Sequence, residues 1–80
     1  MDIEAYIMMN LKSGSEDDVC KLLINYSEVK EIAVIYGEYD VIIKVCTDNM
    51  KSLDTFILEK LRSIPNIFLT ATMLIAKQYK

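Results

Sequence analysis

A short glycine turn between two apolar runs constrains the fold of this chain more than any other feature of its sequence. The turn spans residues 36–40 (Tyr-Gly-Glu-Tyr-Asp), and the runs before and after it are rich in valine and isoleucine. Such runs on both sides of a Gly-Glu loop predict an antiparallel β-hairpin with a two-residue type II′ turn. The predicted register pairs Tyr36 with Tyr39, Ile35 with Asp40, Val34 with Val41, Ala33 with Ile42, Ile32 with Ile43, Glu31 with Lys44 and Val29 with Cys46.

Two further segments have the pattern of β-strands. Residues 3–11 alternate between apolar side chains and a more mixed set, whereas residues 67–76 contain no polar side chain except two threonines. We expect the odd positions of the last strand, from Ile67 onwards, to line the core. The even positions then face away from the core, and these are Phe68, Thr70, Thr72 and Leu74.

Two segments between the strands have the pattern of α-helices. The first follows Ser15, which resembles the start of a capping box with Asp18, and it should end at residues 25–27. Its apolar stripe is Val19, Leu22, Leu23 and Tyr26. The second follows a Thr-Asp-Asn cap at residues 47–49 and ends at Pro65. Its stripe is Met50, Leu53, Phe56, Ile57, Leu61 and Ile64.

The order of these elements is βαββαβ, which predicts an α+β, ferredoxin-like fold. In this fold a four-stranded antiparallel sheet carries two helices on one face. The 80 residues are expected to form a single domain, 1–80. The other sheet face should then expose Tyr6, Met8, Ile35, Ile42, Phe68 and Leu74. An apolar patch of this size usually marks an interface, and no segment is left over to cover it, so we predict dimerisation through this face.

Composition and charge argue against several classes of function. The formal net charge is −3 and the basic residues are scattered, which disfavours direct binding to nucleic acid. The chain has no histidine, and Cys20 and Cys46 stand far apart, so we expect buried free thiols, no metal site and no cofactor. No run approaches the roughly 18 apolar residues of a membrane span, and the start lacks the basic flank of a signal peptide, which predicts a cytoplasmic protein.

With these elements placed, the chain resembles the C-terminal effector-binding (RAM) domain of the Lrp/AsnC family of transcription regulators over residues 3–76. The resemblance is carried by residues 5–9, the 36–40 turn, Leu53, Leu61 and the Thr-Ala-Thr of residues 70–72. The chain departs from the family in having Pro-Asn rather than Pro-Gly at residues 65–66. It also has no room for a helix-turn-helix before this domain, so we expect a stand-alone form.

The resemblance implies an amino-acid-sensing and oligomerisation module that is not an enzyme. It implies dimers formed by sheet packing, further assembly into a ring such as an octamer, a free amino acid bound where dimers meet, and association with full-length regulators. An amino acid needs an acceptor for its ammonium and donors for its carboxylate. The expected ligand-binding residues are Gly37, Tyr39, Asp40, Thr70 and Thr72. Because the first strand separates Asp40 from the threonines, a site shared between subunits is the more natural arrangement.

The same residues have simpler structural roles available to them. Asp40 can cap backbone groups near the turn, the threonines can act as β-formers, and Tyr36 can pack against Tyr39. Glu31 and Lys44 should form an ordinary cross-strand ion pair.

Other functions compatible with this fold are an enzyme of the dimeric α+β barrel type, an ACT-like amino-acid-binding module and a purely structural adaptor. An enzyme is disfavoured because no nucleophile is paired with a base. The ACT-like alternative depends on a glycine after the first strand, and the Ser-Gly-Ser at residues 13–15 only weakly resembles that feature.

Overall fold

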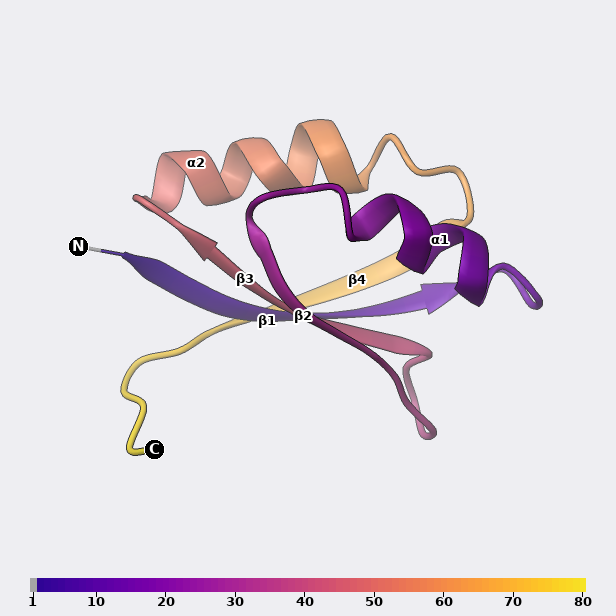
Figure 1. Cartoon of the computed structure of the whole chain (residues 1–80), viewed down its shortest axis with the longest axis horizontal. Helices are drawn as coiled ribbons and strands as arrows, with labels where there is room; N and C mark the ends of the chain where they lie inside the picture. The colour runs from indigo at the N-terminus through magenta and orange to yellow at the C-terminus, as the bar shows by residue number, and fades with distance from the viewer. Residues whose placement is uncertain (1) are drawn as a thin grey trace.

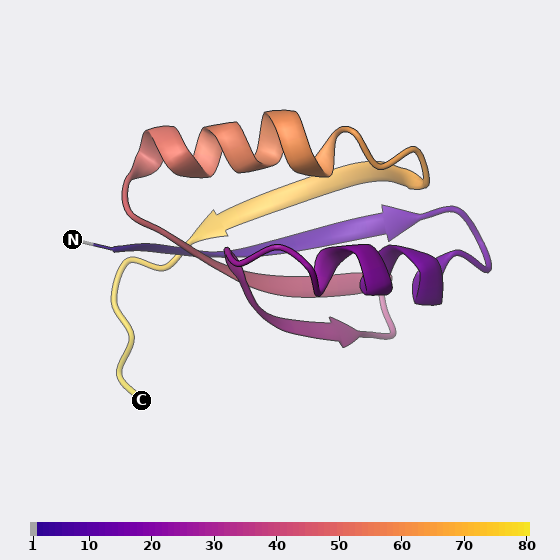
Figure 2. The same cartoon turned by 45° about the horizontal axis from the view of Figure 1, so that its top comes forward.

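A computed structural model describes residues 2–80, which adopt the predicted βαββαβ order (Figure 1). Its elements are β1 (Ile3–Leu11), α1 (Glu16–Leu23), β2 (Val29–Val34), β3 (Val41–Thr47), α2 (Met50–Thr55), the π-helical segment η1 (Phe56–Leu61) and β4 (Ile67–Leu74). The four strands form one antiparallel sheet in the order β2-β3-β1-β4. Figures 1 and 2 show α1 and the continuous α2–η1 helix on the same side of this sheet, as predicted.

The hydrophobic core lies between the sheet and these helices. Every second residue of the two central strands is buried, which matches the period-2 alternation of a strand with one covered face. The buried apolar residues are Ala5, Ile7, Met9, Leu11, Val19, Leu23, Val41, Ile43, Val45, Leu53, Phe56, Leu61 and Ile64. Their removal from water is the main force that holds the helices on the sheet.

The second helix changes from α to π geometry halfway along its length. Asn49 caps its start as predicted, since Asn49 Oδ1 accepts a hydrogen bond from the Ser52 N–H at 2.8 Å. At the other end, the Arg62 N–H donates to the Ile57 carbonyl at 3.2 Å, a bond across five residues. The π segment places Phe56 and Leu61, which are five positions apart, together in the core.

The first helix begins after Ser15, but the predicted capping box does not form. The Ser15 hydroxyl donates to the Lys12 carbonyl at 2.6 Å, so it serves the loop before the helix rather than an N–H of the first turn. Gly14, with φ +85°, provides the sharp bend that this loop requires. The helix ends at Leu23, slightly before the predicted residues 25–27.

The β2–β3 hairpin has the predicted register over most of its length. Four predicted pairs are observed, from Val34 opposite Val41 to Glu31 opposite Lys44. Val29 pairs with Val45 instead of Cys46, because an irregularity at residue 30 shifts the register.

The hairpin loop is wider than the predicted two-residue turn. The last hydrogen bond between the two arms runs from the Ile35 N–H to the Asp40 carbonyl at 2.9 Å, so residues 36–39 form the loop. Tyr36 is fully exposed and does not pack against Tyr39, contrary to the sequence-based expectation. Gly37 has φ +134°, a conformation that favours glycine.

The predicted faces of β4 are wrong because the strand contains a bulge. Leu11 pairs with Ile67 and Asn10 pairs with Leu69, so Phe68 is an extra residue without a partner on β1. One extra residue reverses the face of every side chain after it. Thr70, Thr72 and Leu74 therefore lie on the helix side of the sheet, opposite to the predicted face. Their partners on β1 are the buried residues Met9, Ile7 and Ala5.

The sheet face away from the helices, here called the open face, remains strongly apolar. By register it carries Tyr6, Met8, Ala33, Ile42, Leu69, Ala71 and Met73. Tyr6, Met8 and Ile42 lie on this face as predicted, whereas Leu74 lies on the helix side and Phe68 is the unpaired residue of the bulge. Ile35 follows the last residue of β2 and lies outside the paired register. Leu69 and Met73, both more than half exposed, extend the open face over β4 instead.

Lys44 carries a charge on the open face, and its ion pair differs from the prediction. Its Nζ lies 3.5 Å from Glu4 Oε2 rather than pairing with Glu31, and it also lies 5.9 Å from the centre of the Tyr6 ring. The C-terminal tail runs on this side of the sheet (Figure 1), where Gln78 Oε1 accepts a hydrogen bond from Lys44 Nζ at 3.3 Å. The tail therefore reaches one corner of the open face, which the sequence did not predict.

Candidate functional site

Asp40 is fixed by three hydrogen bonds at the end of the hairpin. Its backbone N–H donates to the Met9 carbonyl and its carbonyl accepts from the Ile35 N–H, each at 2.9 Å. Its carboxylate Oδ2 accepts the Leu11 N–H at 2.8 Å. Because β3 begins only at Val41, this oxygen takes the place of a backbone acceptor beside the end of β1. The expected structural role of Asp40 is to cap backbone groups near the turn, but its carboxylate instead caps the Leu11 N–H on β1, which is 29 residues away in the sequence.

Asp40 also borders a hollow of about 330 Å³ between the hairpin and α1. We call it the acidic hollow, and it is lined by Glu16, Asp17, Val34, Ile35, Tyr36 and Asp40. Glu16 and Asp17 belong to the first turn of α1, where carboxylates also favour the helix dipole. Three carboxylates beside an apolar wall create a negative potential that suits a primary ammonium group.

Thr70 borders a different hollow, of about 430 Å³, where η1 ends and β4 begins. We call it the Arg62 hollow, and it is lined by Leu61, Arg62, Ile67, Phe68, Leu69 and Thr70. Within residues 2–80, Arg62 forms no ion pair. Arg62 and Thr70 supply the side-chain hydrogen-bond donors among these residues, and the other four side chains are apolar.

The single chain does not bring the predicted ligand-binding residues together. Asp40 contacts β1 through Met9, and Thr70 lies opposite the same residue on the other side of β1. Their strands are therefore two strand spacings apart, about 10 Å. The ammonium and carboxylate of an amino acid share one carbon and lie within about 3 Å of each other. An amino acid is therefore much shorter than the separation of these two strands.

None of the other three predicted ligand-binding residues lines either hollow. Gly37 and Tyr39 belong to the hairpin loop beside Asp40, with Gly37 exposed and Tyr39 half-buried. Thr72 lies opposite Ile7 on the exposed part of β4, outside the Arg62 hollow. Sequence analysis missed Glu16, Asp17 and Arg62, because only the fold brings them to the hollows.

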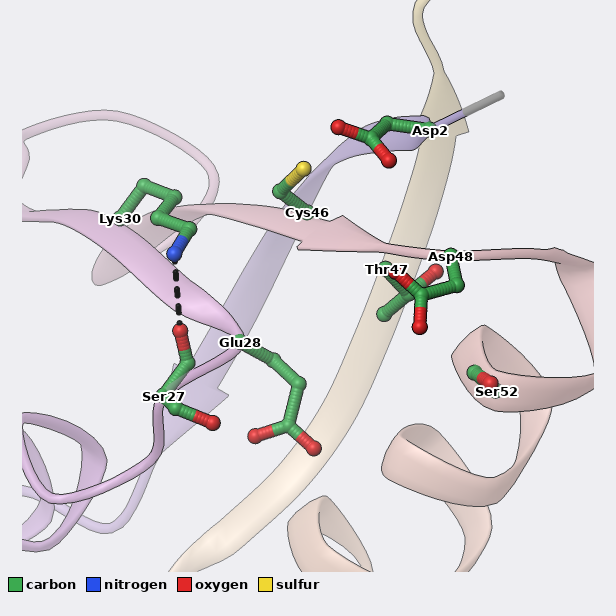
Figure 3. Close-up of a pocket in the computed structure, with 8 residues that line it drawn as sticks. All are labelled: Asp2, Ser27, Glu28, Lys30, Cys46, Thr47, Asp48 and Ser52. Carbon is green, nitrogen blue, oxygen red and sulfur yellow. Dashed lines mark hydrogen bonds between the residues drawn. The ribbon is translucent and has the colours of Figure 1, made fainter.

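A third hollow, of about 440 Å³, lies at the opposite end of the sheet (Figure 3). It is lined by Asp2, Ser27, Glu28, Lys30, Cys46, Thr47, Asp48 and Ser52. Lys30 Nζ donates to the Ser27 carbonyl at 3.1 Å along its rim, as Figure 3 shows. No motif in the sequence pointed to this hollow, because its residues come from four separate segments.

Glu28 links this third hollow to η1 through an ion pair. Its Oε2 accepts a hydrogen bond from Lys60 Nζ at 2.6 Å, and that ammonium lies 5.4 Å from the Tyr26 ring centre and 5.9 Å from the Phe56 ring centre. The hydrogen bond from Lys60 lowers the pKa of Glu28, although partial burial opposes this shift. Oε1 is buried and has no hydrogen-bond partner among the described residues. We interpret this cluster as a structural tie between the start of β2 and η1.

Three further features of residues 2–80 bear on function: their thiols, possible metal ligands and the length of their helices. Cys20 and Cys46 are free thiols that are half-buried rather than buried as predicted, and burial raises the pKa of both. Residues 2–80 contain no group of three or more side chains suited to hold a metal ion. In the same part of the chain, no helix is long and apolar enough to span a membrane.

Comparison with known proteins relates the chain to a family of regulators. The family model for the Lrp/AsnC ligand binding domain matches residues 4–80. The HTH-type transcriptional regulator FL11 of Pyrococcus abyssi is 34% identical over 76 residues, which cover 95% of this chain and 50% of the regulator. The chain thus spans about half the length of the curated relatives it matches.

Several solved structures have the same fold as this chain. The crystal structure of FFRP-DM1 is 48% identical, with a TM-score of 0.89, and the match covers 91% of this chain and 97% of that one. The transcriptional regulator NMB0573 of Neisseria meningitidis, solved as a complex with L-Met, has a TM-score of 0.91 at 19% identity. That match covers 98% of this chain and 52% of the regulator, and it shows a shared fold.

Proposed function

The chain belongs to the Lrp/AsnC ligand-binding domain family, and from this membership we propose that it is an amino-acid-sensing and oligomerisation module that acts on transcription in the cytoplasm. Domains of this family are regulatory parts of transcription regulators, and the residues described here suggest no catalytic role. Relatives such as FL11 are named as helix-turn-helix regulators, and the NMB0573 complex contains L-Met. We propose that this chain responds to a free amino acid and associates with full-length regulators of its family.

The observation that carries this proposal is the placement of Asp40 within the family fold. Asp40 borders the acidic hollow while its Oδ2 holds the end of β1. A ligand ammonium beside this carboxylate would meet a preorganised negative group, because Asp40 cannot swing away without breaking its bond to Leu11. Ligand occupancy would then act directly on the hairpin and on β1.

The separation of the two hollows supports a site shared between copies of the chain. We propose that Gly37, Tyr39 and Asp40 of one copy act with Thr70 and Thr72 of another. The open face would join two copies into a dimer, because an apolar sheet face of this extent is seldom left to solvent. Dimers would then assemble into a ring such as an octamer and form the shared sites where they meet.

Titration calorimetry with the twenty amino acids tests this proposal. We expect at least one to bind with a Kd below about 10 mM, equivalent to roughly −2.7 kcal/mol. Asp40→Asn keeps an oxygen that can accept the Leu11 N–H but removes the charge, so binding should weaken by about 1.5–3 kcal/mol. Asp18→Asn removes the same charge from an exposed position outside the acidic hollow and serves as the control.

Two outcomes would contradict the proposal. If no amino acid binds below about 10 mM, the sensing role is wrong and the structural adaptor becomes the better explanation. If Asp40→Asn leaves affinity unchanged but lowers the melting temperature, Asp40 serves only the end of β1.

A further inference from the structure

The strongest unassigned feature is the Arg62 hollow at the junction of η1 and β4. Arg62 is the only arginine of the chain. It is exposed, and it forms no ion pair with any carboxylate in residues 2–80. A guanidinium presents a planar fork of donors that matches a carboxylate, and Thr70 adds a hydroxyl to the same hollow.

Two local irregularities of the backbone build this hollow. The bond from the Arg62 N–H to the Ile57 carbonyl closes the last π turn and fixes where the Arg62 side chain leaves the helix. The β4 bulge leaves Phe68 unpaired with β1 and 71% exposed. Bulges often redirect a side chain beside a binding site. Phe68 and the half-exposed Leu69 thus add an apolar wall to the hollow that Arg62 also lines.

We infer that the Arg62 hollow is a carboxylate subsite, in which Arg62 and Thr70 bind the carboxylate of the ligand and the wall around Phe68 selects a hydrophobic side chain. This inference rests on the proposed function for the identity of the ligand as an amino acid. Charge complementarity supports it, because the Arg62 hollow offers a cation and the acidic hollow offers carboxylates. The ammonium of the same ligand would be left to the acidic hollow of a neighbouring copy.

The single arginine allows this subsite to be observed directly. Protein labelled with ¹⁵N-arginine should give one side-chain Nε–H signal, that of Arg62. We expect this signal to shift and saturate on titration with leucine and with isocaproate, which is leucine without its amine. Leucinamide, which lacks the carboxylate, should leave the signal in place. Calorimetry on the same samples measures binding independently of Arg62.

A matched pair of variants tests the energetic contribution of Arg62. Arg62→Gln should weaken leucine binding about tenfold or more but leave leucinamide binding unchanged, because only the carboxylate contact is lost. Arg62→Lys should restore part of the affinity, since an ammonium keeps the charge but not the fork. Lys51→Gln removes the same charge from an exposed position of α2 and should have no effect on leucine binding.

The outcomes separate this inference from the proposed function. If leucine binds with measurable heat while the Arg62 signal stays still, the carboxylate subsite is wrong and the sensing role stands. If no amino acid binds but isocaproate moves the Arg62 signal, the subsite stands and the amino-acid role is lost. If neither ligand moves the signal and no amino acid gives heat, both are wrong.

Discussion

Glu28 and Asp40 show how differently two acidic residues can be used in one small domain. Asp40 divides its carboxylate between a strand end and the acidic hollow, so its structural and proposed binding roles coincide. Glu28 instead pairs one oxygen with Lys60, and its other oxygen is buried with no hydrogen-bond partner in residues 2–80. Neither arrangement is visible in the sequence, because both bridge residues that are far apart along the chain.

The Glu28–Lys60 pair makes the stability of the domain depend on pH. Since Lys60 lowers the pKa of Glu28 in the folded state, the pair stabilises the domain above the unfolded pKa, near 4.5, and loses its effect as pH falls through the lower folded value. Glu28→Gln should reduce the free energy of unfolding at pH 7 by about 1 kcal/mol, since both side chains keep some contact with solvent. The difference from the unmodified protein should shrink between pH 5 and pH 3, as followed by urea unfolding.

The control for this experiment is Glu59→Gln, an exposed position of η1 without an ion pair among residues 2–80. A Glu28→Gln effect that is the same at pH 3 and pH 7 would contradict the assigned role of Lys60.

Among the secondary-structure elements, β4 shows that hydrophobic periodicity can predict a strand without predicting which face each side chain occupies. Its residues were correctly assigned to a strand, but the bulge at Phe68 placed Thr70, Thr72 and Leu74 on the face opposite to that predicted. A bulge adds one residue without changing the apolar composition, so the sequence pattern does not reveal it. The same reason explains why the pairing of Val29 was wrong while the hairpin register nearer the loop was confirmed.

In the second helix, the spacing of two apolar residues is the feature of the sequence that corresponds to its π segment. Its predicted stripe contains Phe56 and Leu61, a spacing of five that an α-helix does not place on one face but a π segment does. The order of elements was predictable because hydrophobic periods of 2 and 3.6 are strong signals. The site was only partly predictable, since the turn identified Asp40 whereas Arg62 has no local motif.

The hairpin loop allows a test of how much the conformation of Gly37 contributes to stability. Gly37 has φ +134°, and a Cβ built there would meet no atom within 4 Å, so Gly37→Ala would cost backbone strain without a clash. We expect the free energy of unfolding to fall by about 1–3 kcal/mol. Glu38→Ala changes a neighbouring loop residue whose φ is not positive and serves as the control. Chemical unfolding of the two variants measures the difference, and equal stabilities would show that the loop tolerates another conformation.

For the molecule as a whole, we propose that the open face joins two copies into a dimer. Ile42 lies at its centre, between Met8 on β1 and Ala33 on β2. Ile42→Lys would bury an unpaired charge in the proposed dimer, which is costly, so the dimer should dissociate or the chain unfold. Light scattering should then report a mass near 9.2 kDa instead of at least twice this value.

Leu58→Lys is the matched control, because Leu58 is 54% exposed on η1 and lies on the helix side of the sheet. It should leave the dimer intact. A monomer mass for the unmodified native protein at micromolar concentration would refute the proposed interface.

The position of β1 at the centre of the sheet also has a consequence for how the domain folds. Its pairing with β4 joins opposite ends of the described chain, for example Ala5 with Leu74, whereas β2 and β3 meet across a short loop. Closing the longer loop costs more chain entropy before any contact compensates for it, so we expect the hairpin to form early and β4 to pair late. Until then β4, which has no charged residue, remains an unpaired strand able to join the wrong partner. We therefore expect the pairing of β4 to be the slow step of folding, and the chain to be most prone to aggregation before that step.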